Sequence, residues 1–151
     1  MNCLDVISDP PLVLRRDDKV ADALEKMLEA RLTSVPVTDG KGRYIGMFRV
    51  RRVIGLALPK AATVDHLVDD ISYLHEDLAD LTRHLDSVRN SPVGKHIDES
   101  VPSLKPDMQI SEVLLRLYRV SNTLPVVEQP SGKLLGIITS QRILTSLMGN
   151  D

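Results

Sequence analysis

The chain has 151 residues, 42% of them hydrophobic and 26% charged, which suffices for one compact unit or two half-size repeats. No apolar run approaches the roughly 18–20 residues of a membrane span, the opening residues 1–10 lack the basic start of a signal peptide, and a net charge of −2 gives no general attraction for nucleic acid. The single cysteine, Cys3, excludes an intrachain disulfide, so we predict a cytoplasmic protein whose one thiol is buried and inert.

Apolar spacing predicts the order of elements in the first sixty residues. We expect a strand at 12–14, a helix from Val20, a strand around Pro36, a turn at 39–42, a second strand and a helix at 50–58. Asp17 or Asp18 can cap the first helix, and Asp22 suits the positive end of its dipole. Glycine in the turn favours a β-hairpin with a positive φ.

The segment 61–92 has a different pattern, in which apolar residues alternate in steps of three and four. They are Val64, Leu67, Ile71, Leu74, Leu78, Leu81, Leu85 and Val88. This heptad pattern predicts one long, coiled-coil-like helix, capped near Thr63, stopped at Ser91-Pro92 and roughly 39 Å long. Its narrow seam favours pairing with the same helix of a second chain, and packing along the repeats of its own chain is the alternative.

The central region is also acidic, since residues 61–100 hold nine acidic against three basic side chains. The flanks are mildly basic, with 11 against 8 in residues 1–60 and 5 against 4 in residues 101–151. This contrast marks a boundary. The acidic face is interpreted as a solvated surface, with a docking surface for a basic partner as the alternative.

The last sixty residues repeat the first at an offset of ninety positions. Ile7 matches Ile97, Leu14 matches Leu104 and Val20 matches Ile110, after which a one-residue slip brings the strand of Pro36 onto that of Pro125. Asp107 and Glu112 take the same capping and dipole roles in the second helix. Neither copy buries both faces of its sheet alone, so the two are expected to stack sheet to sheet.

The strands Gly46-Met47-Phe48 and Gly136-Ile137-Ile138-Thr139, each following a Val/Leu-Pro-Val strand, resemble the repeats of the CBS domain family. Asp5-Val6-Ile7 and Lys95-His96-Ile97 look like the lead-in segments of that family. The resemblance covers residues 3–58 and 93–148, and it implies an α/β fold in which two βαββα repeats form a pseudo-twofold pair, a Bateman module. We therefore predict repeat 1 at 1–60, the helical insertion at 61–92 and repeat 2 at 93–151.

Metal and catalytic sites are not predicted. His66, His75 and His84 are spaced by nine, so neighbouring side chains fall on opposite faces of a helix. One cysteine and no carboxylate–histidine pair at ligand spacing argue against a metal site. The chain also lacks a glycine-rich phosphate loop and a nucleophile elbow, so we predict that it is not an enzyme.

The resemblance implies adenosine nucleotides between the repeats, with the base on apolar residues and a Ser/Thr-x-x-Asp motif holding phosphate and ribose. Here Thr139 is followed by Arg142, while Arg49 and Arg52 replace both motif residues in the first copy. Losing the ribose acceptor weakens AMP-type binding by about 1–3 kcal/mol, whereas the arginines suit polyphosphate or another anion. The alternative is that these arginines are solvated or salt-bridged and that the cleft no longer binds a ligand. The candidate ligand-binding residues are Val13, Val35, Pro36, Arg49, Arg52, Ser103, Leu124, Pro125, Thr139 and Arg142.

The functional prediction is a regulatory, homodimeric module that senses AMP, ADP, ATP, S-adenosylmethionine or a related anion and acts on an unidentified protein. The long helix would transmit a change in the angle between the repeats. The alternative is a structural dimerisation or docking module whose cleft binds nothing. Four aromatic residues offer little base stacking, which disfavours nucleic acid.

Overall fold

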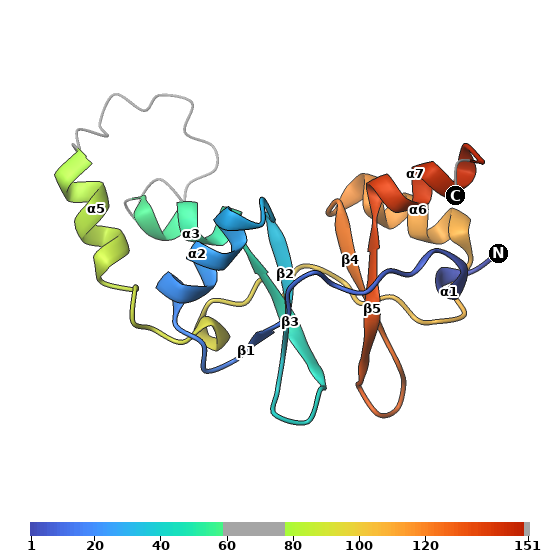
Figure 1. Ribbon diagram of the computed structural model, residues 1–151, viewed down its shortest axis with the longest axis horizontal. Coiled ribbons are helices and arrows are strands. Elements are labelled where there is room, and N and C mark those ends of the chain that lie inside the picture. Colours follow the sequence, from blue (N-terminus) through green and yellow to red (C-terminus); the bar gives the residue numbers. More distant parts are fainter. Residues whose placement is uncertain (59–77, 150–151) are drawn as a thin grey trace.

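The computed structural model describes residues 1–58 and 78–149, which form two similar α/β halves side by side (Figure 1). In chain order, residues 1–58 form α1 (Cys3–Val6), β1 (Leu14–Arg15), α2 (Val20–Glu29), β2 (Ser34–Thr38), β3 (Tyr44–Arg49) and α3 (Val50–Ala57). Residues 78–149 form α5 (Leu78–Asp86), the 3₁₀ helix η1 (Val93–Lys95), α6 (Ile110–Arg119), β4 (Thr123–Val127), β5 (Leu134–Thr139) and α7 (Ser140–Leu147). The predicted βαββα order is confirmed.

The two sheets share one topology. β1 runs parallel to β2, which pairs antiparallel with β3. β4 pairs antiparallel with β5, and the first strand of repeat 2 is reduced to a parallel bridge between Leu104 and Val126. The predicted one-residue slip is present, because repeat 1 has one residue more between its first helix and the proline strand. Arg31, with a φ of 58°, turns the chain in that connection.

The first helix of each repeat buries the apolar stripe predicted from its spacing. Val20, Ala23 and Met27 of α2 are buried, as are the matching apolar residues of α6. The predicted caps are wrong: the N-cap positions are Lys19 and Gln109. Asp18 instead accepts a hydrogen bond from the Arg15 N–H at 2.9 Å, which closes the turn after β1. A short polar side chain that can bond its own turn does not cap the helix that follows.

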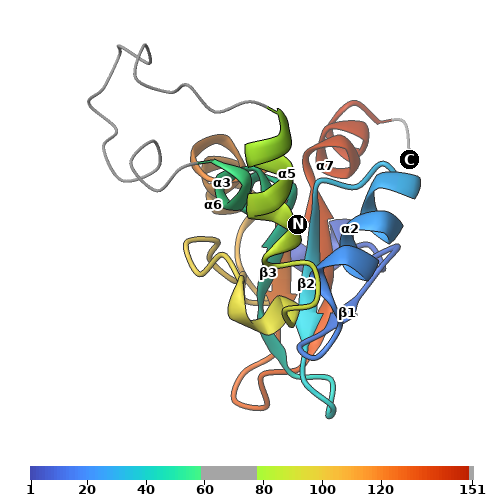
Figure 2. The same cartoon turned by 90° about the vertical axis from the view of Figure 1, so that its left-hand side faces the viewer.

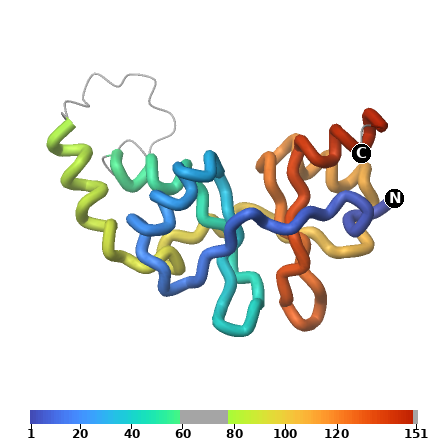
Figure 3. Tube along the Cα trace, viewed as in Figure 1, coloured from blue at the N-terminus to red at the C-terminus, as the bar shows by residue number. Residues whose placement is uncertain are grey.

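The lead-in segments, residues 2–8 and 92–98, cross to the opposite repeat. Cys3 and Val6 belong to the buried cluster of repeat 2, whereas Val93 belongs to that of repeat 1. Figure 3 shows that the N-terminal segment (blue) begins beside the helices of repeat 2 (orange and red) and then crosses to repeat 1. Each repeat core is therefore completed by residues from the other half of the sequence. Boundaries placed at 60 and 93 do not describe this exchange of segments.

The sheets face each other and the helices lie outside, as expected for stacking sheet to sheet (Figure 1). Along β3, Phe48 points into the core of repeat 1 and Met47 into that of repeat 2, and both are fully buried. The alternation follows from the twofold side-chain period of a strand. One strand thus contributes to both hydrophobic cores.

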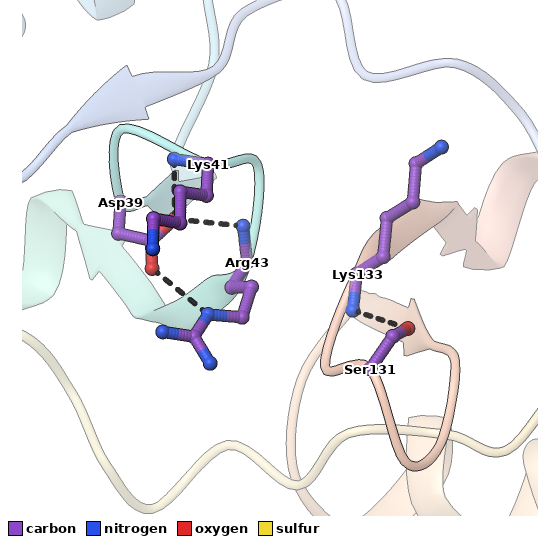
Figure 4. Close-up of polar contacts among 5 residues, drawn as sticks. All are labelled: Asp39, Lys41, Arg43, Ser131 and Lys133. Carbon is purple, nitrogen blue, oxygen red and sulfur yellow. Dashed lines mark hydrogen bonds and ion pairs between the residues drawn. The ribbon is translucent and has the colours of Figure 1, made fainter.

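The hairpin turns also join the repeats. Gly42 and Gly132 have φ values of 80° and 76°, as predicted for these turns. The Tyr44 N–H donates to the Gly132 carbonyl at 2.9 Å, and the Leu134 N–H donates to the Gly42 carbonyl at 3.2 Å. Figure 4 shows the two turns and their side chains, including the Asp39 carboxylate bonded to Arg43. The exchange is twofold-symmetric, since each residue matches its partner at an offset of ninety.

The described end of the predicted long helix is α5, which ends at Asp86 rather than at Ser91-Pro92. α5 lies beside α3 in both views (Figures 1 and 2), and Leu85 packs against the core of repeat 1. His84 Nδ1 lies 3.1 Å from the Ala57 carbonyl oxygen. At Leu85 the seam therefore packs on its own chain, the alternative to intermolecular pairing, whereas Leu78 is 79% exposed. The remaining predicted seam residues, at 64–74, lie outside the described residues.

Candidate ligand-binding site

The ends of β3 and β5 lie at equivalent places, where each strand leads directly into a helix. Thr139 is the N-cap of α7, and its Oγ1 accepts a hydrogen bond from the Arg142 N–H at 3.1 Å. Arg49 is the N-cap of α3, but its side chain turns towards Asp98. The hydroxyl predicted for phosphate thus already sits at a helix N-terminus in repeat 2, while repeat 1 presents a guanidinium.

Arg49 and Asp98 form an ion pair between the repeats. Arg49 Nη1 lies 2.9 Å from Asp98 Oδ2, and the side chains are 15% and 21% exposed. Partial burial alone would raise the pKa of the Asp98 carboxyl, but hydrogen bonds from Ser100 and Arg49 hold that pKa below its ordinary value. The pair is therefore charged at neutral pH and largely shielded from water.

Cations gather beside this pair. Arg52, on α3, is exposed, and Lys95 and His96 belong to the lead-in segment of repeat 2. Burial, together with the positive charges of Arg52 and Lys95, lowers the pKa of the His96 imidazole. His96 Nε2 lies 3.0 Å from Ser91 Oγ. The side of repeat 1 that faces the lead-in segment is therefore cationic at its rim.

The predicted apolar contacts fall into two groups. Val35 and Leu124 are 1% and 0% exposed and belong to the cores of their own repeats, and the neighbouring prolines, Pro36 and Pro125, are buried as well. Val13 and Ser103, by contrast, are exposed. The structure thus brings Arg49 and Arg52 together at one strand end and Thr139 and Arg142 at the other, with the buried residues beneath as support.

Two features escaped the sequence-based prediction. A cavity of about 420 Å³ lies where the lead-in segment of repeat 2 crosses repeat 1, and it is lined by Arg16, Asp17, Ile45, Pro92, Gly94, Lys95 and Ile97. Within the described residues, the hydroxyls of Ser34 and Tyr44 are buried without a hydrogen-bond partner. Ser34 stands opposite Arg49 in the β2–β3 register. No motif marks these positions, because they arise where segments distant in sequence meet.

The model of the CBS domain family matches residues 4–58 and 93–149, which cover most of the chain. The chain belongs to the CBS domain family. CBS domains are generally regulatory rather than catalytic. Of the Ser/Thr-x-x-Asp motif expected from the sequence, the two CBS repeats keep one hydroxyl, Thr139, and carry arginine at both aspartate positions.

Solved structures of CBS proteins share this fold. The chain is similar to a CBS domain-containing protein of unknown function from Kribbella flavida DSM 17836, with 23% identity, a TM-score of 0.67 and coverage of 98% of this chain and 99% of that one. It is also similar to CBSX2 in complex with AMP, with 20% identity, a TM-score of 0.70 and coverage of 98% of this chain and 96% of that one. A third similar structure is the CBS domain pair of MJ0100 in complex with 5′-methylthioadenosine and S-adenosyl-L-methionine. Its identity is 14%, its TM-score is 0.64, and the match covers 100% of this chain and 98% of that one. No curated protein matches the chain in sequence.

Two further findings concern the parts of the chain that the structure describes. Among residues 1–58 and 78–149, no group of three or more metal-ligating side chains is placed to hold an ion. Within the same ranges, no helix is both long enough and apolar enough to cross a bilayer. Cys3 is fully buried, as predicted, and burial raises the pKa of its thiol.

Proposed function

We propose that this CBS pair is a regulatory module that binds an adenine nucleotide or a related anionic metabolite between its repeats. The observation that carries the proposal is the Thr139 hydroxyl at the end of β5. It is held at the first turn of α7 by the Arg142 N–H and still has its own O–H to donate. A hydroxyl at a helix N-terminus favours a phosphate oxygen, because the backbone N–H groups and the helix dipole add to it.

The relatives support the choice of ligand class. CBSX2 has been solved with AMP, and the MJ0100 pair with 5′-methylthioadenosine and S-adenosyl-L-methionine. Arginine at both aspartate positions favours ligands with more negative charge than AMP, since guanidinium groups form paired bonds with phosphate oxygens. We seek the ligand contacts among the ten residues proposed from the sequence, with Thr139 and Arg142 in the leading role.

Thermal unfolding against AMP, ADP, ATP, S-adenosylmethionine, dinucleotides and inorganic phosphate tests the proposal. A ligand at a hundred times its Kd stabilises the folded state by about 2.7 kcal/mol, which raises the Tm by about 5–11 °C. The shift should disappear in Thr139→Ala and persist in Thr145→Ala, a second threonine of α7 whose hydroxyl bonds the Gln141 carbonyl. No shift with any compound would overturn the proposal.

A second candidate function is structural dimerisation, which the exposed apolar residues of repeat 2 favour. α6 and α7 lie on the outer side of that repeat (Figure 1) and expose 88% of Tyr118, 72% of Met148, 53% of Leu144, 50% of Leu147 and 46% of Leu115. Together they present on the order of 600 Å² of side chain, the upper end for a monomer. In repeat 1, α5 packs on α3, the equivalent of α7. We propose that a second copy covers this face.

Light scattering after size exclusion tests the assembly. The wild type should have the mass of a dimer, and Tyr118→Glu with Leu144→Glu should have that of a monomer, because a buried charge without a partner is strongly unfavourable. Leu28→Glu on α2, where the leucine is 60% exposed, is the matched control and should remain dimeric. A monomeric wild type would contradict the proposal. A dimer without any ligand effect would favour the purely structural function.

A further inference from the structure

The two strand ends are not equivalent as ligand sites. We infer that the repeat 2 site, formed around Thr139, takes the ligand, and that the Arg49–Asp98 ion pair closes the repeat 1 site. This inference rests on the proposed function and makes it more specific, since it assigns one ligand to each chain. It also gives Arg49 a role in closing a site rather than in binding.

The backbone at the two sites is nearly identical, so the difference lies in the side chains. The Asp98 N–H donates to the Met47 carbonyl at 2.8 Å, and the Ser8 N–H donates to the Ile137 carbonyl at 2.8 Å. These residues match at an offset of ninety, as do Arg49 and Thr139. Two oppositely charged side chains in repeat 1 thus replace two hydroxyls in repeat 2.

Charge disfavours an anion in the repeat 1 site. A phosphate that approached Arg49 would also meet the Asp98 carboxylate, 2.9 Å from the guanidinium. Ser100 donates to the same carboxylate through its N–H at 2.9 Å, which fixes its position. Replacing the carboxylate with a ligand would leave a partly buried negative charge without its cation, which is costly. The cations Arg52 and Lys95 are exposed, so solvent screens their attraction for a ligand.

The two sites also differ in the hydroxyl that stands opposite the strand end. The Ser34 hydroxyl, opposite Arg49 in the strand register, is buried and lacks a partner among the described residues. Thr123, its equivalent, stands opposite Thr139, and its hydroxyl is not enclosed without a partner in this way, although Ser34 and Thr123 are both partly exposed as whole residues. The hydroxyl beside Arg49 is therefore cut off from solvent.

Stoichiometry by isothermal titration with AMP and with ATP tests the inference. The wild type should bind one nucleotide per chain, and Thr139→Ala should bind none. The double variant Arg49→Thr with Asp98→Ser gives repeat 1 the side chains of repeat 2 and should bind two. The converse variant, Thr139→Arg with Ser8→Asp, should bind none. Circular dichroism checks that each variant is folded.

The matched control is Arg43→Thr with Asp39→Ser, which removes another ion pair, at 3.2 Å, from a hairpin turn outside both sites. It should still bind one nucleotide. Two nucleotides per wild-type chain would overturn the inference and leave the proposed function standing. One nucleotide that Thr139→Ala retains would overturn the inference together with the role of Thr139 in the proposed function. One nucleotide in Arg49→Thr with Asp98→Ser would also overturn the inference. Absence of binding by every variant and every compound of the thermal panel would overturn both.

Discussion

Replacing Gly136 with alanine should destabilise the protein, because the lead-in segment of repeat 1 leaves no room for a Cβ atom. An added Cβ would lie 2.7 Å from the Ser8 carbonyl oxygen and 2.7 Å from Ile7 Cγ1. The isoleucine can rotate away. The carbonyl oxygen cannot, since it accepts a hydrogen bond from the Ile137 N–H at 2.9 Å. The backbone bridge between the repeats must therefore stretch.

The magnitude follows from that bridge. Ser8 and Ile137 exchange two backbone hydrogen bonds, each worth about 1 kcal/mol net, and forcing a methyl group into a packed site costs about 1–3 kcal/mol. Because the two costs overlap, we expect a loss of about 3 kcal/mol and a fall in Tm of about 6–12 °C. Urea unfolding followed by circular dichroism measures the loss.

Gly55→Ala is the matched control for this prediction. Gly55 lies inside α3, and a Cβ there would meet nothing within 4 Å. Alanine in a helix interior is favoured over glycine, so this variant should gain about 0.5–1 kcal/mol. Opposite signs for the two substitutions are expected. Equal stability of Gly136→Ala and the wild type would refute the close packing of the lead-in segment on repeat 2.

Three further predictions concern titratable groups. The pKa of Asp98 is lowered in the folded state, so its carboxylate stabilises the protein at a pH above its ordinary pKa of 3.8, and this contribution is lost as the pH falls below that value. Acid unfolding of Asp98→Asn should lack that loss. If the acid side of the stability curve is unchanged in Asp98→Asn, the ion pair is contradicted. The pKa of His96 is lowered as well, so the stability of the protein should decrease as the pH falls through the ordinary histidine pKa of 6.5. Urea titrations between about pH 7 and pH 5, which bracket that value, should show a flatter pH dependence for His96→Gln. Cys3, 0% exposed and with its pKa raised by burial, should react with a thiol reagent only after unfolding; rapid labelling of the native protein would show that α1 is not packed as described.

The repeat and its elements could be predicted from the sequence, because apolar spacing and turn glycines are local signals. The stripe beginning at Val20 and the positive φ of Gly42 both follow from residues within a few positions of each other. The caps failed for a related reason. Asp18 lies one residue before Lys19, the N-cap, and a local pattern does not tell which of two nearby backbone donors a carboxylate will accept from.

The crossing of the lead-in segments could not be predicted in the same way. Apolar residues such as Val6 and Val93 show that a segment is buried, but not in which of two similar cores. The Arg49–Asp98 pair joins residues 49 positions apart, so no motif links them. From the sequence alone, Arg49 is interpreted either as a ligand for an anion or as a solvated or salt-bridged side chain. In the fold it is half of an ion pair, and this changes the chemistry expected of it.

The twofold repeat makes the location of these differences informative. Where backbone meets backbone, the halves agree: the bridges of Ser8 and Asp98 have the same length, and the hairpin turns exchange matching hydrogen bonds. At the strand ends the side chains of the two halves differ in charge. Arg49 and Asp98 in one half correspond to Thr139 and Ser8 in the other, at an offset of ninety positions. Packing between the repeats requires the contacts of the lead-in segments, since a Cβ added at Gly46 or Gly136 would clash with the segment that crosses it. The side chains at the strand ends are not held by such contacts, so they can differ in charge while the backbone contacts between the repeats stay the same.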